Sequence, residues 1–257
     1  MKKTIKKYFA LVAMIAFAAV GITSCGGSSG SDSEADEIPT DGLLGDLPML
    51  TAKYCNKIVD LREKLFSGQL TENELKEARA EFDETEKERD AKLLLSKQAI
   101  NGKEIPVEVQ KGLAVSINGP FKIDSDGGKN ESIHAVGTVE LQKDLVYADI
   151  ANLYIVPIDT DGKAIATKRG GLWYQEDGKT SLESMKKGMK CMIKAYVSVG
   201  STSANSRNTS EMKRWAKLAK YVIMDCNSDE FKKLKEQLEA DKKAEEIEAA
   251  KKVVGEK

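Results

Sequence analysis

The spacing of apolar residues changes from a helical to a strand period part-way along the chain, and this change constrains the fold more than any other feature. Before residue 100 apolar side chains recur every three or four residues, whereas between Leu113 and Cys226 they alternate with polar ones. These are the periods of amphipathic α-helices and of half-buried β-strands. We therefore expect an α+β protein in which helices precede a β domain.

Residues 47–100 have the pattern of a helical hairpin. Thr71 and Glu74 have the spacing of a capping box, which predicts that a second helix begins after a break at 67–69. A short turn between two amphipathic helices predicts antiparallel neighbours. We expect the hairpin to pack on the downstream domain, and a partner-binding stalk is the alternative. The apolar stripe of the first helix is Leu50, Tyr54, Ile58, Leu61 and Leu65.

Residues 112–226 have the pattern of an antiparallel β-sandwich. About eight short segments of period 2 alternate with turn signals that contain glycine, which is typical of sandwiches. The run Leu153–Ile158 is apolar throughout and predicts a central strand. Pro157 within this run predicts a bulge or a sheet edge towards its end, because proline donates no ladder hydrogen bond.

Two further helices are expected around the end of the β domain. Ser210 has the position of an N-cap for a short helix over 211–220, and residues 221–225 then form a final strand. Residues 228–257 are expected to form a charged helix, because Glu-rich and Lys-rich turns interleave. Its apolar stripe is too short for a coiled coil. That stripe is Phe231, Leu234 and Leu238.

Residues 1–24 have the pattern of an export signal. Lysines precede the apolar run Tyr8–Ile22, whose 15 residues are fewer than the roughly 20 that a membrane-spanning helix needs. Ile22-Thr23-Ser24-Cys25 follows and resembles the lipobox of bacterial lipoproteins. The resemblance implies that Cys25 is lipidated and becomes the first residue of a mature chain anchored to a membrane by acyl chains. Gly26, in place of an aspartate, implies the outer membrane, with the periplasmic or surface side left open.

Residues 25–46 are expected to form a disordered acidic tether behind this anchor. Gly, Ser, Asp and Glu dominate the segment as far as Leu43. Such a composition cannot bury enough apolar surface to offset the entropy of ordering the chain. The acidic residues are similar in character to the export signal of some surface-exposed lipoproteins, and a solvated spacer is the alternative.

The β domain carries a second resemblance. Tyr154-Ile155-Val156, the hairpin signature Asp159–Lys163 and the turn Lys187-Gly188 before a strand are similar to the immunoglobulin-like modules of bacterial envelope lipoproteins. The similarity covers about 60 residues, a fraction of one sandwich domain of roughly 100. It implies an immunoglobulin-like sandwich that serves as a binding or structural module for another envelope protein.

Two pairs of residues are candidates for a site. Cys191 and Cys226 both lie on apolar faces of strands, so a disulfide between them is possible in the oxidising envelope, with buried thiols as the alternative. Trp173 and Tyr174 are the best candidates for ligand contact, because exposed aromatic rings stack on sugars or anchor a partner. The alternative places Trp173 in the core with Tyr174 pointing outward.

Several classes of function are disfavoured. The 40 basic and 41 acidic residues give no net field for nucleic acid, and the single histidine excludes a multi-histidine metal centre. That residue, His134, falls on the polar side of a strand pattern. Two segments, Asp124–Gly127 and Asp159–Gly162, resemble the start of calcium loops. Ala135 and Gly170 stand where the loop needs glutamate, so we expect ordinary hairpin turns and no metal, with a weak turn-bound calcium as the alternative.

The expected function follows from these observations. No P-loop, zinc-protease or nucleophile-elbow motif is present in the sequence, and we expect no cofactor. We expect a non-catalytic, lipid-anchored module that binds or holds another envelope component. A carbohydrate-binding accessory protein or an enzyme that uses the region of Trp173 and Tyr174 is the alternative.

Overall fold

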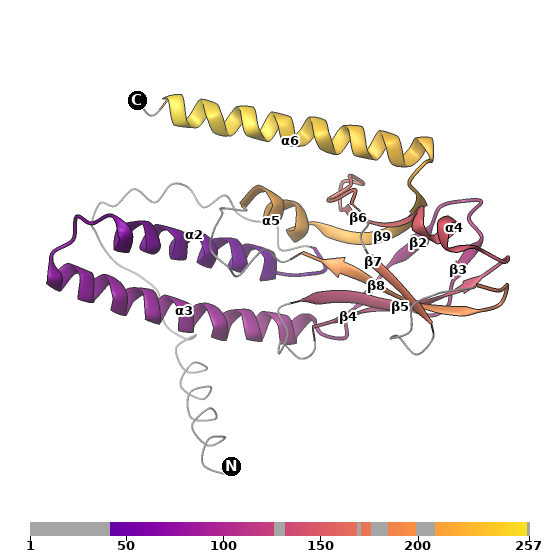
Figure 1. Cartoon of the computed structure of the whole chain (residues 1–257), viewed down its shortest axis with the longest axis horizontal. Coiled ribbons are helices and arrows are strands. Elements are labelled where there is room, and N and C mark those ends of the chain that lie inside the picture. Colours follow the sequence, from indigo (N-terminus) through magenta and orange to yellow (C-terminus); the bar gives the residue numbers. More distant parts are fainter. Residues whose placement is uncertain (1–41, 126–131, 169–170, 176–184, 199–208, 256–257) are drawn as a thin grey trace, which may run out of the picture. The chain divides into compact units, whose positions relative to one another are not determined.

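The computed structural model describes residues 42–125, 132–168, 171–175, 185–198 and 209–255, and within them the protein is α+β (Figure 1). The predicted export signal, Cys25 and most of the predicted tether lie outside these ranges. None of the helices that the structure describes is long and apolar enough to cross a membrane.

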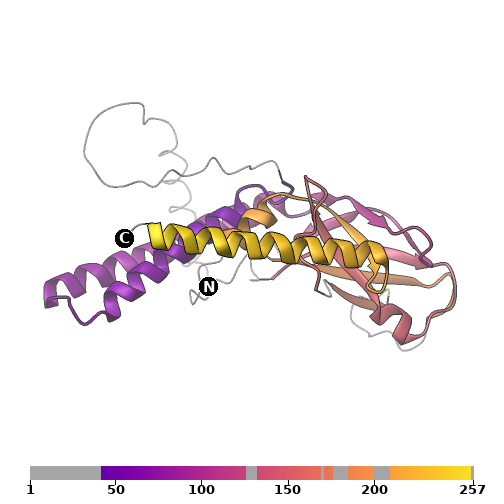
Figure 2. The same cartoon turned by 90° about the horizontal axis from the view of Figure 1, so that it is seen from above.

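The first two helices, α2 (Leu47–Phe66) and α3 (Glu72–Ile100), pack side by side as the predicted hairpin (Figures 1 and 2). The capping box is confirmed: the Thr71 hydroxyl accepts a hydrogen bond from the Glu74 backbone N–H, and the Glu74 carboxylate accepts one from the Thr71 N–H at 2.8 Å. Most of the predicted stripe of α2 is buried, because it faces α3 and the β domain.

The larger sheet is antiparallel at every pairing that the described residues make. Its order is β1-β4-β5-β8-β7, and β3 pairs with the far end of β5. The long alternating segments form its centre, as their period 2 predicts. The strands are β1 (Glu104–Ile105), β3 (Val115–Ile117), β4 (Phe121–Asp124), β5 (Ile133–Leu141), β7 (Gly171–Gln175) and β8 (Lys190–Val197).

The smaller sheet has the order β2-β9-β6 and contains a parallel pair, β2 with β9, which departs from the antiparallel expectation. The apolar run of β6 is an edge strand here, so the prediction of a central strand was wrong. Side chains of β6 are buried on both faces because a second cluster that includes α6 covers one of them. The register shift expected near Pro157 occurs between Ile158 and Asp159. The strands are β2 (Val107–Val109), β6 (Leu153–Asp159) and β9 (Leu218–Asp225).

The core lies between the two sheets and continues under the hairpin. The main cluster joins Ile193 of β8, Ile223 of β9 and Leu47 of α2. On the other face of the small sheet, Val156 and Met224 pack with Phe231 in the second cluster. The side chains of β9 therefore alternate between the two clusters.

Two segment boundaries differ from the sequence expectations. Residues 42–46 form an ordered turn rather than tether: Leu44 is fully buried, and the Leu43 N–H donates to the Leu218 carbonyl at 2.9 Å. Strands β1 and β2, within residues 104–109, precede the predicted start of the β domain at 112.

The remaining helices are α4 (Tyr147–Ala151), α5 (Thr209–Ala216) and α6 (Asp229–Gly255). Helix α4 was not predicted, because five residues show no helical period. Helix α5 ends before the predicted residue 220, since Leu218 already begins β9. The Ser228 hydroxyl accepts a hydrogen bond from the Phe231 N–H at the start of α6.

Candidate functional site

The solvent-facing side of the larger sheet carries aromatic and cationic side chains, and we call it the outer face. Alternate residues of β4, β5 and β8 are buried, so the residues between them point away from the core. Tyr196 is the most exposed aromatic residue on this face, at 44 %. The outer face consists of Lys122, Asp124, His134, Val136, Thr138, Tyr174, Met192, Lys194 and Tyr196.

Strand register arranges these residues in rows across the sheet. Asp124, His134 and Tyr196 form one row, and the next row is Lys122, Val136 and Lys194. Neighbouring strands lie about 4.8 Å apart, so the two lysine Cα atoms are separated by about 10 Å. Within the described ranges no ion pair joins either lysine to a carboxylate. The centre of the outer face is therefore cationic.

Aromatic rings flank this cationic centre. The ring centroids of His134 and Tyr196 are 5.5 Å apart with planes tilted by 49°. The Lys194 ammonium lies 5.1 Å from the centroid of the Tyr174 ring, which is cation–π geometry. The sequence pattern identified Tyr174 but missed Tyr196 and Lys194. Only the pairing of β7 with β8 brings them together, and pairing is not visible in one strand's alternation.

His134 is held neutral by its surroundings. Burial lowers the pKa of the imidazole, and the charge of Lys194 lowers this pKa further, while Asp124 opposes both effects. The third ring of the site therefore carries no charge at neutral pH. Protonation below that pKa adds a positive charge between Asp124 and Tyr196.

We expect His134→Gln to reduce the loss of folding stability that the protein shows as pH falls. The folded-state pKa lies below the unfolded value, so the imidazole favours folding above the unfolded pKa of about 6.5. This contribution is lost as pH falls from that value through the lower folded-state pKa. Urea midpoints of both proteins at pH about 7.5 and 5 measure the effect. An equal loss of stability in the two proteins on acidification contradicts the assignment.

The side chains of Trp173 and Tyr174 point to opposite faces of β7, as the alternation of a strand requires. Trp173 is only 7 % exposed and belongs to the main core cluster, whereas Tyr174 lies on the outer face. The arrangement given as the alternative, with tryptophan inside and tyrosine outside, is the observed one. Trp173 is therefore a packing residue, and Tyr174 keeps the role of a ligand candidate.

The cysteines of the described part are free thiols, and the bond between Cys191 and Cys226 is not formed. The two residues face different surroundings. Cys191 is in the main cluster, and burial raises the pKa of its thiol to about 11. Cys226 packs against the second cluster, on the other face of the smaller sheet. Cys55 is buried in α2. Alternation placed both strand residues on apolar faces, but these faces belong to two clusters.

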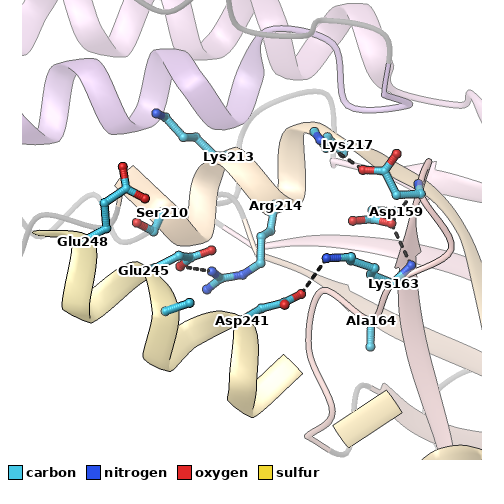
Figure 3. A pocket seen from close by; sticks show the side chains of 12 residues that line it. Asp159, Lys163, Ala164, Ser210, Lys213, Arg214, Lys217, Asp241, Glu245 and Glu248 are labelled. Carbon is cyan, nitrogen blue, oxygen red and sulfur yellow. Dashed lines mark hydrogen bonds and ion pairs between the residues drawn. The ribbon is translucent and has the colours of Figure 1, made fainter. Parts of the chain in front are cut away.

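A charged cleft of about 560 Å³ lies between the end of β6, α5 and α6 (Figure 3). Lys163 pairs with Asp241 of α6 at 2.9 Å, and Lys217 pairs with Asp161 at 3.1 Å. Arg214 of α5 forms an ion pair with Glu245 of α6 (Figure 3). The opposite charges of the cleft thus pair across it and hold α6 against the domain.

The Asp159–Gly162 segment in this cleft is a side-chain-capped turn. One carboxylate oxygen of Asp159 accepts the N–H groups of Asp161 and Lys163 at 2.9 and 2.8 Å. Among the described residues, no three metal-ligating side chains of the His, Cys, Asp or Glu type converge. The other candidate calcium segment, Asp124–Gly127, extends beyond the described residues.

Removing the charge of Glu245 is expected to loosen the docking of α6. The Arg214 side chain is mostly buried, so Glu245→Gln weakens a partly desolvated pair and costs about 1 kcal/mol. Amide hydrogen exchange along α6 measures the change. Lys235→Gln is the control, because its pair with Glu239 lies along one exposed helix surface and contributes less. Equal effects of the two substitutions contradict the docking role.

Comparison with known proteins adds no relative: no family model, curated protein or solved structure matches this chain. The assignment of function therefore rests on the residues and their geometry.

Proposed function

We propose that the protein is a lipid-anchored lipoprotein of the bacterial envelope, located at the outer membrane, that binds another envelope component without catalysing a reaction. Cys25 is the lipidated residue, and the residues that follow it tether the folded part. The binding surface is the outer face.

The observation that supports this function is the contrast between two charged regions. In the cleft beside α6, cations and carboxylates of the chain pair with one another. On the outer face, Lys122 is exposed and Lys194 is half-buried over the ring of Tyr174, and within the described ranges neither lysine has such a pairing. Cations that the chain leaves to solvent beside aromatic rings are suited to an external ligand.

We further propose that the β domain is an immunoglobulin-like sandwich. Its support is the main core cluster, which joins inward side chains of the larger sheet and of β9. The parallel pair of β2 and β9 is then an addition at the edge of the smaller sheet.

Site-specific photocrosslinking in living cells tests the binding role. A benzoyl-phenylalanine in place of Tyr196 is expected to capture a recurrent envelope component, identified by mass spectrometry. The same group in place of Tyr147, an exposed tyrosine outside the outer face, is the matched control. Recurrent capture from position 147 but not from 196 overturns the choice of surface. Absence of any recurrent partner from both positions overturns the binding role.

The anchor is tested separately through the lipid itself. Cells fed radiolabelled palmitate are expected to label the natural protein but not Cys25→Ser, which also keeps its signal peptide and migrates more slowly. Labelling of the Cys25→Ser variant overturns the assignment of the lipidated residue.

Carbohydrate binding is a second candidate function, in an accessory protein or an enzyme. Tyr174 and Tyr196 favour it, because both present aromatic rings on one exposed sheet surface.

A further inference from the structure

We propose that the outer face binds an anionic glycan, with the sugar rings on Tyr174 and Tyr196 and acidic groups on Lys194 and Lys122. This inference rests on the proposed use of the outer face and names the chemical class of its ligand.

The charge of the outer face selects an anion. Lys122 and Lys194 flank Val136 in one row, so both ammonium groups project from the same side of the sheet. Asp124 lies one row away at the end of β4, and Glu140 lies opposite Lys190, so the carboxylates occupy the margins. Two cations at the centre of the outer face attract a ligand whose negative charge reaches them.

The aromatic groups select a ligand with flat apolar surfaces. Tyr174 is opposite Met192, and Tyr196 lies four residues further along β8. At about 3.3 Å per residue, the two tyrosines are separated by about 13 Å along the strand, with Lys194 between them. A sugar chain offers this alternation, because C–H faces of successive rings pack on aromatic rings while acidic substituents reach the cation.

The His134 ring extends the same surface and adds a dependence on pH. The groups that face it are Asp124 of β4 and Lys194 and Tyr196 of β8. Its protonation raises the positive charge of the site by one. Sugar carboxylates, with pKa values near those of other carboxyl groups, remain ionised at pH 5.5. Binding is therefore expected to strengthen as pH falls through the lowered pKa of His134, and His134→Gln removes this gain.

Calorimetric titration of the purified full-length, lipidated protein in detergent tests the proposal. The probes are hexagalacturonate, its methyl ester, a sulfated heparin hexasaccharide and a single-stranded oligodeoxyribonucleotide. We expect the two acidic sugars to bind, and the methyl ester to bind about tenfold more weakly, because the ester removes the charge and keeps the rings. Raising NaCl from about 0.05 to 0.5 M is expected to weaken binding.

Substitutions locate the binding on the outer face. Tyr196→Ala and Lys194→Gln are each expected to reduce affinity about five- to tenfold. The matched controls, Tyr147→Ala and Lys186→Gln, change an exposed tyrosine and an exposed lysine outside the outer face and leave affinity unchanged.

Four results overturn the proposal: no binding of either acidic sugar, equal binding of the methyl ester, tighter binding of the oligodeoxyribonucleotide, or equal losses in the control variants. If no sugar binds but crosslinking from position 196 captures a recurrent protein, the glycan proposal is wrong and the proposed binding role stands. If no sugar binds and position 196 captures no recurrent partner, the outer face is not a binding surface.

Discussion

Gly137→Ala is expected to destabilise the β domain by about 2 to 3 kcal/mol. A Cβ atom at this position would lie 2.2 Å from a ring carbon of Phe121, which is directly opposite on β4 and fully buried. The ring covers the glycine and fills the space that a side chain would take. Inserting a methyl group into a packed core forces neighbouring side chains to move, at about 1 to 3 kcal/mol. Guanidinium denaturation followed by circular dichroism measures the loss.

A smaller residue at position 121 tests whether the loss of stability in Gly137→Ala comes from the clash with the Phe121 ring. Phe121→Leu alone costs stability, and combined with Gly137→Ala it is expected to cost clearly less than the two single losses together. Strictly additive losses in this double-mutant cycle contradict direct contact between the added methyl group and the ring. The comparison needs no assumption about the rest of the sheet.

Trp215→Ala is expected to cost about 3 to 5 kcal/mol. The indole is buried on the face of α5 that also carries Met212, and α5 packs on α2. Removing it leaves a cavity that rigid helices and strands cannot close. Gly42 packs closely against the end of α5, where a Cβ on this glycine would clash with the Ala216 carbonyl oxygen. We therefore expect faster hydrogen exchange in residues 42–66 as well as a lower denaturation midpoint.

Phe66→Ala is the matched control for this substitution. Phe66 ends α2 and is 85 % exposed, so its removal deletes an aromatic ring without opening a cavity. Its effect is expected to stay within about 0.5 kcal/mol. Comparable losses from both substitutions show that loss of an aromatic ring, rather than burial, sets the cost.

Local signals in the sequence were sufficient for the hairpin and for the long strands. The capping box at Thr71 needs only residues three apart, and the alternation in β5 and β8 needs only one face to be buried. Leu153–Ile158 shows the limit of such signals. β6 is an edge strand whose second face is covered by a helix, so both of its faces are buried. A strand buried in this way has the same apolar composition as a central strand, and the sequence pattern does not distinguish the two.

The outer face was predictable only in part. Alternation puts Tyr174, His134 and Tyr196 on the outside of their own strands. It does not say that β8 lies between β5 and β7, which is what gathers them around Lys194. The candidate bond between Cys191 and Cys226 is absent for the same reason. The sequence shows that a strand has an apolar face but does not show which core cluster that face joins.

The position of β9 has a consequence for the order of folding. β9 is the middle strand of the smaller sheet, and its partners β2 and β6 come earlier in the chain. Neither β2 nor β6 can form its hydrogen bonds with β9 before β9 has been synthesised, and pairings between distant segments form slowly. Until then the apolar surface of β6 stays open to aggregation. A chain that ends before Leu218 retains β2 and β6 without the strand that joins them, so the last 40 of the 257 residues decide when this sheet forms.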